Sequence, residues 1–367
     1  MDLKFFSETP LLSLSFLEKL KKNNEFEFRP SIDGVTQNGE CLNLGFSCYA
    51  LKINFMTGSW HNFSSEYRES WIKYILSYQS SSRMFPLNSF IDEALLSGYN
   101  KLSKQEELKY FIKTILNILP FFNYDSKKTA ILKAINAETK QAIATLYETG
   151  FINDLKLENT FLTKGKATEY LKSLNWDKPW SAGAQFASLC LYSITNDFGL
   201  EKELNNFISQ KLVTNTGSYH NLNISDKREI INGAMKVISG LDWLNQEIHK
   251  PKELIDFCLK NVPQTEGCDI VDFVYVLYKC SLQVNYRKKE INQLFILLLE
   301  QIKRLYISED EGFSYFPNKS QTHYYGVKIT NGLNKADIHG TTLCLWAILM
   351  ILDNLEEMDS KMNIIKP

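Results

Sequence analysis

The sequence is short of the two residues that most often interrupt regular structure. It holds 17 glycines and 9 prolines among 367 residues, well below the roughly 12% that these two residues make up in an average protein. This shortage excludes a β-sandwich punctuated by turns, a collagen-like chain and a low-complexity linker protein. Hydrophobic residues make up 44% and aromatic residues 13% of the chain. The chain can therefore bury a large core, and intrinsic disorder is excluded.

An excess of one charge is missing as well. The 41 basic and 42 acidic side chains leave a formal net charge of -1, and no long basic run occurs. A protein that binds nucleic acid would show a basic patch or stripe. We therefore expect a small-molecule or glycan ligand and no nucleic-acid partner, while the oligomeric state stays open.

Targeting and membrane segments are not found in the sequence. The first residues lack the basic region and continuous apolar core of a secretory signal, and no window approaches about 18 uncharged apolar residues. The seven cysteines form no Cys-x-x-Cys pair, and most lie in apolar helical patterns. We expect reduced, mostly buried thiols in a cytoplasmic protein without a transmembrane segment.

Helical periodicity runs along almost the whole chain and separates two kinds of helix. Helices of one kind are apolar nearly all round and must be buried, whereas helices of the other kind are amphipathic and would cover the first from outside. The apolar helices are expected at residues 45–56, 130–147, 179–194, 230–244, 267–282 and 336–352. The amphipathic helices are expected at residues 66–78, 104–119, 167–174, 201–212, 252–259 and 288–305.

The two kinds largely alternate, and this order predicts an all-α (α/α)6 toroid, in which an inner ring of helices is wrapped by an outer ring. An α-solenoid is the competing architecture. Solenoid repeats usually have a constant length, whereas the apolar helices begin 37 to 85 residues apart. We expect one toroid domain over residues 1–367 with a lead-in segment at 1–40. Residues 88–100 find no place in the six pairs.

Polar residues gather at the start of the last two apolar helices. Asp269 lies in a first turn, where a carboxylate can act as a cap. Asp272 interrupts an apolar run, and a buried carboxylate there needs a specific reason. Asp337 is a natural N-cap, while His339 in the same first turn is not required by capping. Because a toroid places the N-termini of successive inner helices around one end of its cavity, Asp272 and His339 should share a pocket. We take all four as catalytic candidates.

Two segments carry a resemblance to a known superfamily. Gly45–Lys52, Thr57–Trp60 and Trp71–Gln79 run as inner helix, aromatic turn and amphipathic helix ending in Gln. This order resembles the repeats of the terpenoid cyclase and protein prenyltransferase superfamily. Asp310–Tyr315 is similar to its Gly-Gly-Phe turn. The resemblance implies an α/α toroid enzyme that acts on an isoprenoid by acid-assisted cyclisation or prenyl transfer.

The functional motifs of that superfamily are incomplete in this chain. Its prenyltransferases hold zinc with an Asp, a Cys two residues later and a distant His. The resemblance transfers the Asp to Asp272 and the His to His339, but Val274 stands at the Cys position, and Cys268 could substitute only with altered geometry. A catalytic zinc needs at least three protein ligands, so zinc remains a weak expectation. The Asp-x-Asp-Asp acid of the cyclases has Val271 at its third position.

Aromatic and polar residues at the helix mouths also suit a sugar, because sugar rings stack on aromatic faces and their hydroxyls need polar partners. The candidate substrate-binding residues are Trp176, Trp180, Gln185, Tyr219, His220, Asn232, Tyr315 and Tyr325. A glycosidase would need two carboxylates, from Asp272 with Asp337 or Glu311. A lyase or epimerase would use His339, His220 or Tyr325 as acid or base.

Three hypotheses result. An isoprenoid enzyme would have a deep aromatic cavity, a glycan-active enzyme would have an open polar cleft, and a non-catalytic helical scaffold would have a filled centre. The polar residues of the last two apolar helices that capping does not require disfavour the scaffold. The repeats near the N-terminus favour the isoprenoid substrate, which we rank first, and the loop composition favours the glycan.

Overall fold

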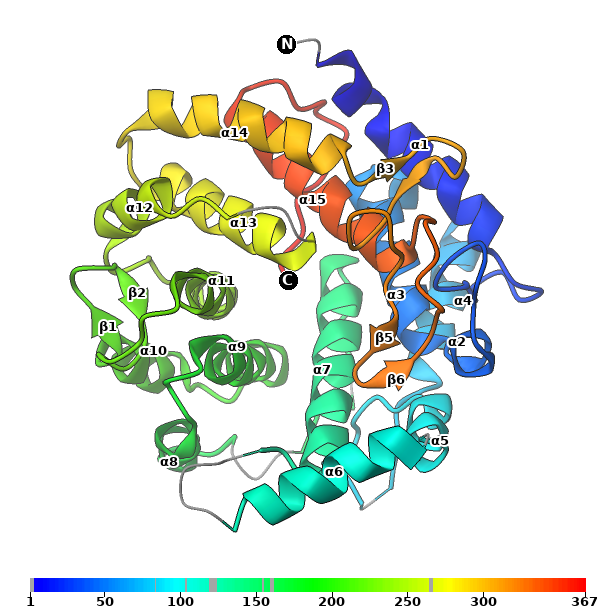
Figure 1. Cartoon of the computed structure of the whole chain (residues 1–367), viewed down its shortest axis with the longest axis horizontal. Coiled ribbons are helices and arrows are strands. Elements are labelled where there is room, and N and C mark those ends of the chain that lie inside the picture. Colours follow the sequence, from blue (N-terminus) through cyan, green and yellow to red (C-terminus); the bar gives the residue numbers. More distant parts are fainter. Residues whose placement is uncertain are drawn as a thin grey trace.

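The computed structural model describes residues 3–82, 84–102, 104–118, 124–153, 155–158, 162–263 and 267–367. Within these ranges, six helices form an inner ring: α3 (Leu44–Met56), α7 (Lys127–Glu148), α9 (Pro179–Asn196), α11 (Lys227–Trp243), α13 (Gly267–Gln283) and α15 (Ile338–Asn354). The outer helices are α1 (Lys4–Leu20), α4 (Ser65–Leu76), α8 (Lys166–Ser173), α10 (Glu201–Ser209), α12 (Pro251–Lys260) and α14 (Lys288–Lys303). The predicted all-α toroid is confirmed (Figure 1).

The inner helices close on themselves. Each packs against the next in the order α3, α7, α9, α11, α13 and α15, and α15 packs back against α3. This closure excludes the open solenoid. The inner helices bury residues on nearly all sides, as α15 does from Cys344 through Leu352, because they have neighbours on both sides and an outer helix behind them. The apolar periodicity of the sequence follows from this double burial.

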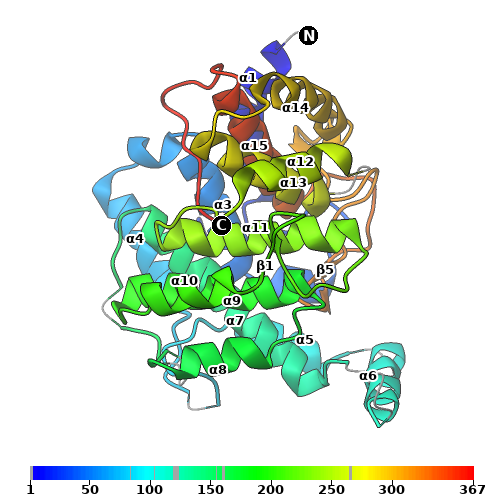
Figure 2. The same cartoon turned by 90° about the vertical axis from the view of Figure 1, so that its left-hand side faces the viewer.

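The sequence-based prediction missed one outer helix and misplaced another. Helix α1 lies within the 1–40 lead-in segment and packs against α15 and α3, which completes the outer ring. Helix α6 (Lys104–Leu116), expected to cover the ring, instead projects from the body (Figure 2). Its apolar side chains are exposed, with Phe111 at 62%. The same spacing of apolar residues suits a covering helix and an unpartnered one, so periodicity alone could not tell them apart.

Short elements decorate the ring. They are the helices α2 (Gln37–Cys41) and α5 (Glu93–Asn100), the 3-10 helix η1 (Ser59–Asn62), and three antiparallel hairpins. Strand β1 (Leu212–Val213) pairs with β2 (Ser218–Tyr219), β3 (Tyr306–Ile307) with β4 (Gly312–Phe313), and β5 (His323–Tyr324) with β6 (Val327–Lys328). Helix α5 accounts for most of the segment that had found no place in the six pairs.

Two hairpins explain why Gly and aromatic residues recur at the turns. In β4, a Cβ on Gly312 would lie 2.7 Å from Cγ of Phe16 in α1, so only glycine permits this close approach. Between β5 and β6, Tyr325 and Gly326 have φ angles of 43° and 89°, as a two-residue hairpin turn with two left-handed positions requires. The hydroxyl of Tyr99 donates a hydrogen bond to the carbonyl of Tyr325 and fixes this uncommon backbone.

Residues 363–367 cross the C-terminal ends of three inner helices. The backbone N–H of Asn363 donates to the carbonyl of Met56 in α3 over 2.9 Å. The backbone N–H of Lys366 donates to Oε1 of Glu148 in α7 over 2.6 Å, and Nε1 of Trp243 in α11 donates to the carbonyl of Pro367 over 3.0 Å. In the described part of the chain, no helix is both long and apolar enough to cross a membrane.

Candidate functional site

The beginnings of α13 and α15 meet α3 around one imidazole. The ring of His339, in the first turn of α15, stacks on Tyr49 of α3 with centroids 4.7 Å apart and planes 18° from parallel. It also lies 5.0 Å from the ring of Tyr315, which follows β4. The imidazole is thus held by aromatic faces, and its Nδ1 is buried without a hydrogen-bond partner among the described residues.

The same tyrosine connects His339 to the acidic start of α13. The hydroxyl of Tyr315 and Sγ of Cys268 are 2.7 Å apart. Asp272 lies one turn further along the helix on the same face as Cys268, and it is only 4% exposed. Its Oδ2 has no hydrogen-bond partner within the described part of the chain. Tyr315 therefore links His339 at the start of α15 to Cys268 at the start of α13, and Asp272 lies one helical turn from Cys268.

The environment of the two candidate groups sets their protonation. Burial raises the pKa of Asp272 to about 6, the neighbouring Asp269 adds to the rise, and Lys236 and Lys140 oppose it. Burial lowers the pKa of His339 to about 3, and the charges of Lys236 and Lys52 lower it further. Near neutral pH the imidazole is therefore uncharged, and the carboxyl titrates close to the range in which enzymes transfer protons.

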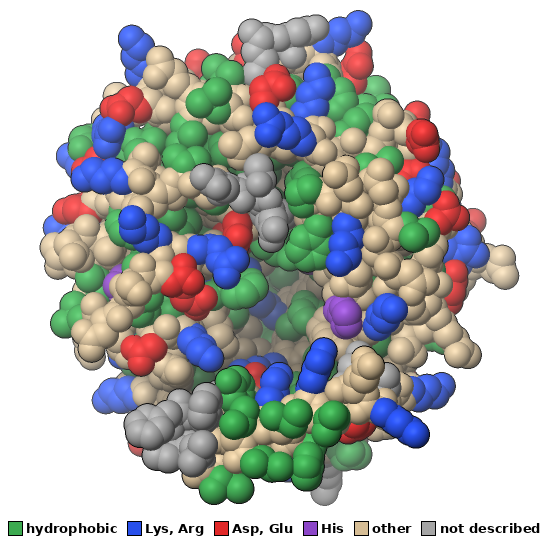
Figure 3. Space-filling model, viewed as in Figure 1, with side chains coloured by type: hydrophobic (Ala, Val, Ile, Leu, Met, Phe, Trp, Pro, Cys, Tyr) green, Lys and Arg blue, Asp and Glu red, His purple; other side chains and the backbone are tan. Residues whose placement is uncertain are grey.

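Three lysines of the inner ring belong to this centre, and the sequence-based prediction did not include them. Lys140 of α7 interacts electrostatically with Lys52 of α3, Lys236 of α11 and Asp272 of α13. Helices α7 and α13 are not neighbours in the ring, so side chains from both meet only at its centre. Figure 3 shows that this face of the molecule is hollowed near its middle, with basic side chains around the opening. Lys52 and Lys236 interrupt apolar runs of inner helices, and that signal could have identified them.

Two of the four catalytic candidates are held by structural contacts. Asp337 caps α15: its Oδ1 accepts from the backbone N–H of Gly340 over 2.7 Å, and its Oδ2 accepts from those of Tyr315 over 2.7 Å and Gln321 over 3.0 Å. Asp269, at the start of α13, accepts a 2.7 Å hydrogen bond from Nδ2 of Asn232 in α11. Asp337 thus fixes the backbone of Tyr315, and Asp269 ties α13 to α11.

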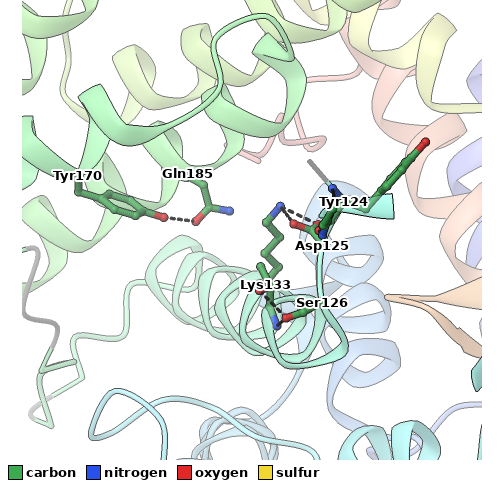
Figure 4. Close-up of polar contacts among 8 residues, drawn as sticks. Tyr124, Asp125, Ser126, Lys133, Tyr170 and Gln185 are labelled. Carbon is green, nitrogen blue, oxygen red and sulfur yellow. Dashed lines mark hydrogen bonds and ion pairs between the residues drawn. The ribbon is translucent and has the colours of Figure 1, made fainter. Parts of the chain in front are cut away.

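Beside the centre, a pocket of about 610 Å³ opens between α7, α8 and α9. One wall is the hydrogen-bonded set of Tyr170, Gln185 and Asn136: Oε1 of Gln185 accepts from the hydroxyl of Tyr170 over 3.0 Å and from Nδ2 of Asn136 over 3.1 Å. Across the pocket, Nζ of Lys133 pairs with Asp125 over 2.7 Å (Figure 4). Asn136 is one turn before Lys140 on the same face of α7, but Lys52, Lys140 and Lys236 are not among the residues that line the pocket.

The other predicted sugar-binding residues are dispersed. Trp176 is buried and donates from Nε1 to the carbonyl of Leu171 over 2.9 Å, so it fills the core. Trp180 is 43% exposed and is not among the residues that line the pocket. Tyr219 is fully buried, with its hydroxyl 3.0 Å from Nδ1 of His249, and His220 is bonded within its own hairpin to Thr216 and Asn221. These four stabilise the fold or lie at its surface, whereas Gln185 lines the pocket, Tyr315 contacts His339, and Tyr325 forms the turn between β5 and β6.

The weak zinc candidates do not form a ligand set. Among the described residues, no group of three or more His, Cys, Asp or Glu side chains is arranged to hold a metal ion. Burial raises the pKa of the Cys268 thiol to about 12, which disfavours the thiolate that zinc requires. We therefore derive no step through a metal.

Comparison with known proteins adds solved structures but no sequence relative. No family model and no curated protein matches the chain. An α-1,6-mannanase from Salegentibacter sp. HEL1_6 matches with 12% identity and a TM-score of 0.45 over 95% of this chain and 99% of its own. Its inactive variant in complex with α-1,6-mannotetrose has 13% identity and a TM-score of 0.46, with the same coverage. A polysaccharide lyase has 13% identity and a TM-score of 0.42 over 96% of this chain and 99% of its own. Similarity at this level concerns the fold alone.

The predicted membership in the terpenoid cyclase and prenyltransferase superfamily is wrong, and so is the isoprenoid function ranked first. The solved structures found to match are instead an α-1,6-mannanase and a polysaccharide lyase. The turns that carried the resemblance have local causes, because Gly312 is required by its contact with Phe16.

Proposed function

We propose that this protein is a carbohydrate-active enzyme that transfers protons on a sugar, as a lyase or an epimerase does. The observation that carries the proposal is the position of Asp272 and His339 on either side of the Cys268–Tyr315 contact, each with a buried polar atom that lacks a partner in the described structure. Buried polar atoms are normally satisfied. A substrate hydroxyl or a transferred proton would satisfy these two.

Each group supports a distinct part of the reaction. Asp272, whose pKa is raised to about 6, suits a general base that takes a proton and can return it near neutral pH. The pKa of Tyr315 is raised by burial and by the nearby Cys268 and Asp272, so its hydroxyl stays protonated and can donate. Neutral His339 can accept a hydrogen bond from a sugar hydroxyl at Nδ1. The faces of Tyr49 and Tyr315 restrain the imidazole ring.

Hydrolysis of a glycosidic bond is supported less well. A glycosidase needs a second carboxylate opposite the first, and the two carboxylates proposed for that role are engaged elsewhere. Asp337 accepts three backbone hydrogen bonds as a cap. Glu311 pairs with Lys19 of α1 over 2.8 Å. Proton transfer by Asp272 and Tyr315 needs no second carboxylate.

The test is a panel of neutral and acidic oligosaccharides incubated with the full-length protein. Ultraviolet absorbance of an unsaturated product reports a lyase, exchange of a carbon-bound proton in deuterated water reports an epimerase, and new reducing ends without unsaturation report a hydrolase. We expect one of the first two signals, and Asp272→Asn should abolish it. The exposed Asp359→Asn serves as the matched control. Hydrolysis, or full turnover by Asp272→Asn, would contradict the proposal.

A further inference from the structure

Lys52, Lys140 and Lys236 lie on inner helices, where Lys52 is buried and the other two are half-buried. They come from three inner helices, and Lys52 is only 8% exposed, whereas lysine is almost never buried unless it is paired. The charges of Lys52 and Lys236 both lower the pKa of Lys140 and that of His339, and all three lysines lie on inner helices. Three like charges brought together in this way destabilise the protein unless an anion compensates for them.

Protein carboxylates do not supply that compensation. Elsewhere in the ring, lysines are paired: Nζ of Lys279 lies 2.7 Å from Asp242, and Nζ of Lys335 lies 3.3 Å from Asp310. No described carboxylate lies within 4.0 Å of the ammonium groups of Lys52, Lys140 or Lys236. The carboxylates whose charges reach them are Asp272, near Lys140, and Glu148, near Lys52. Glu148 already accepts the backbone N–H of Lys366.

We infer that the centre of the ring binds the acidic substituent of a sugar, a carboxylate, through Lys52, Lys140 and Lys236. That the ligand is a sugar rests on the proposed function, and that it carries a negative charge rests on the three lysines. Two carboxylates of the protein act on the three lysines, Asp272 on Lys140 and Lys236 and Glu148 on Lys52, so one anionic ligand brings the local charge close to neutrality. Lysine binds such groups as a point charge and does not demand the planar, two-pronged geometry of arginine.

The carboxylate is favoured over other anions because it suits the chemistry at Asp272. When Asp272 takes a proton from the sugar carbon next to the carboxylate, the electron pair of that C–H bond passes onto the carboxylate oxygens. Ammonium groups at those oxygens stabilise the charge that develops there. A sulfate or phosphate ester would satisfy the lysines but would not accept this electron pair.

The inference is tested by binding without turnover. Asp272→Asn is titrated calorimetrically with a hexuronate trisaccharide, with its carboxyl-reduced neutral counterpart and with a sulfated neutral trisaccharide. We expect the hexuronate to bind at least tenfold more tightly than the other two. Each of Lys52→Met, Lys140→Met and Lys236→Met should weaken hexuronate binding roughly tenfold, as expected for the loss of a charged contact, with no effect on the neutral sugar. Lys289→Met, at an exposed lysine, is the control.

A second measurement separates an anion site from a structural one. Methionine keeps the length and apolar stem of lysine, so removal of an uncompensated charge should raise the melting temperature of the ligand-free protein. A lower melting temperature in all three variants would overturn the inference, because it would show that the lysines already have partners. Equal affinity for the hexuronate and the neutral sugar would also overturn it, as would tighter binding of the sulfated sugar.

The outcomes distinguish this inference from the proposed function. Hexuronate binding that depends on the lysines, combined with no turnover by the unmodified protein, would contradict the enzyme and support the anion site. Turnover of a neutral glycan that is unaffected by the lysine variants would support the enzyme and contradict the anion site.

Discussion

The N-terminal ends of α13 and α15 lie side by side and each carries an aspartate, yet the two carboxyl groups differ in every contact. Asp337 at the start of α15 accepts three backbone N–H groups. Asp272, in the second turn of α13, has a buried oxygen without a partner among the described residues. Both are almost completely buried, at 1% and 4% exposure. Burial alone therefore does not distinguish the two carboxyl groups, whereas the unpaired oxygen of Asp272 needs an explanation that Asp337 does not.

The largest effect that this comparison predicts is on activity. Asp272→Asn removes the ionisable group but keeps the shape of the side chain, so we expect kcat/KM to fall by roughly 100-fold or more. The unfolding free energy should stay unchanged or rise, because no hydrogen bond to Oδ2 is lost. Steady-state kinetics combined with urea denaturation checks both parts. A large loss of stability would show that Asp272, like Asp337, has a structural role.

The matched substitution at the other aspartate should do the opposite. In Asp337→Asn, the amide NH2 would face the N–H groups of Tyr315 and Gln321, and these donors would lose their acceptor. We expect the unfolding free energy to fall by roughly 2–4 kcal/mol, as measured by urea denaturation. Activity should fall only as far as the backbone of Tyr315 is displaced. An unchanged unfolding free energy would show that this cap is not required.

A smaller effect is expected from pH, through Lys140. Its pKa is lowered to about 7, mainly by burial and then by Lys236 and Lys52, while Cys190 and Asp272 act in the opposite direction. Lys140 is therefore charged below that pH and loses its charge as the pH rises through it. The affinity for a hexuronate should decline over the same range.

The control for this pH dependence is Lys140→Arg, because arginine stays charged. Calorimetric titrations at a series of pH values should show that the decline moves to higher pH in this variant. A decline that stays at the same pH would assign the titration to another group.

The smallest effect is expected at Trp180. It is 43% exposed and does not line the pocket, so Trp180→Ala should change the unfolding free energy by no more than about 0.5 kcal/mol and leave turnover intact. Its neighbour Trp176, which is buried with a satisfied Nε1, should cost roughly 3–5 kcal/mol when it is replaced by alanine. Thermal melts and activity assays of both variants test the contrast. A loss of turnover in Trp180→Ala would return that residue to the site.

The sequence was most informative where one physical cause determined the pattern. All-round burial makes the inner helices apolar, so α9 and α13 begin at residues 179 and 267, as predicted. The order of the helices then placed Asp272 and His339 together. Contacts between residues far apart in the sequence left no such local pattern. Nothing local distinguishes α6, which projects, from a helix that covers the ring, and the convergence of Lys52, Lys140 and Lys236 depends on closure of the ring.

The segment at residues 363–367 has a mechanical consequence. By bonding to the ends of α3, α7 and α11, it joins three inner helices at the rim where they end. At the rim where α13 and α15 begin, the ties are side chains: Asn232 of α11 holds Asp269, and Asp337 caps α15. Removal of residues 363–367 should therefore speed hydrogen exchange in the last turns of α3, α7 and α11 and leave the first turns of α13 and α15 unchanged. The end segment would then stabilise the ring without touching the end that carries Asp272 and His339.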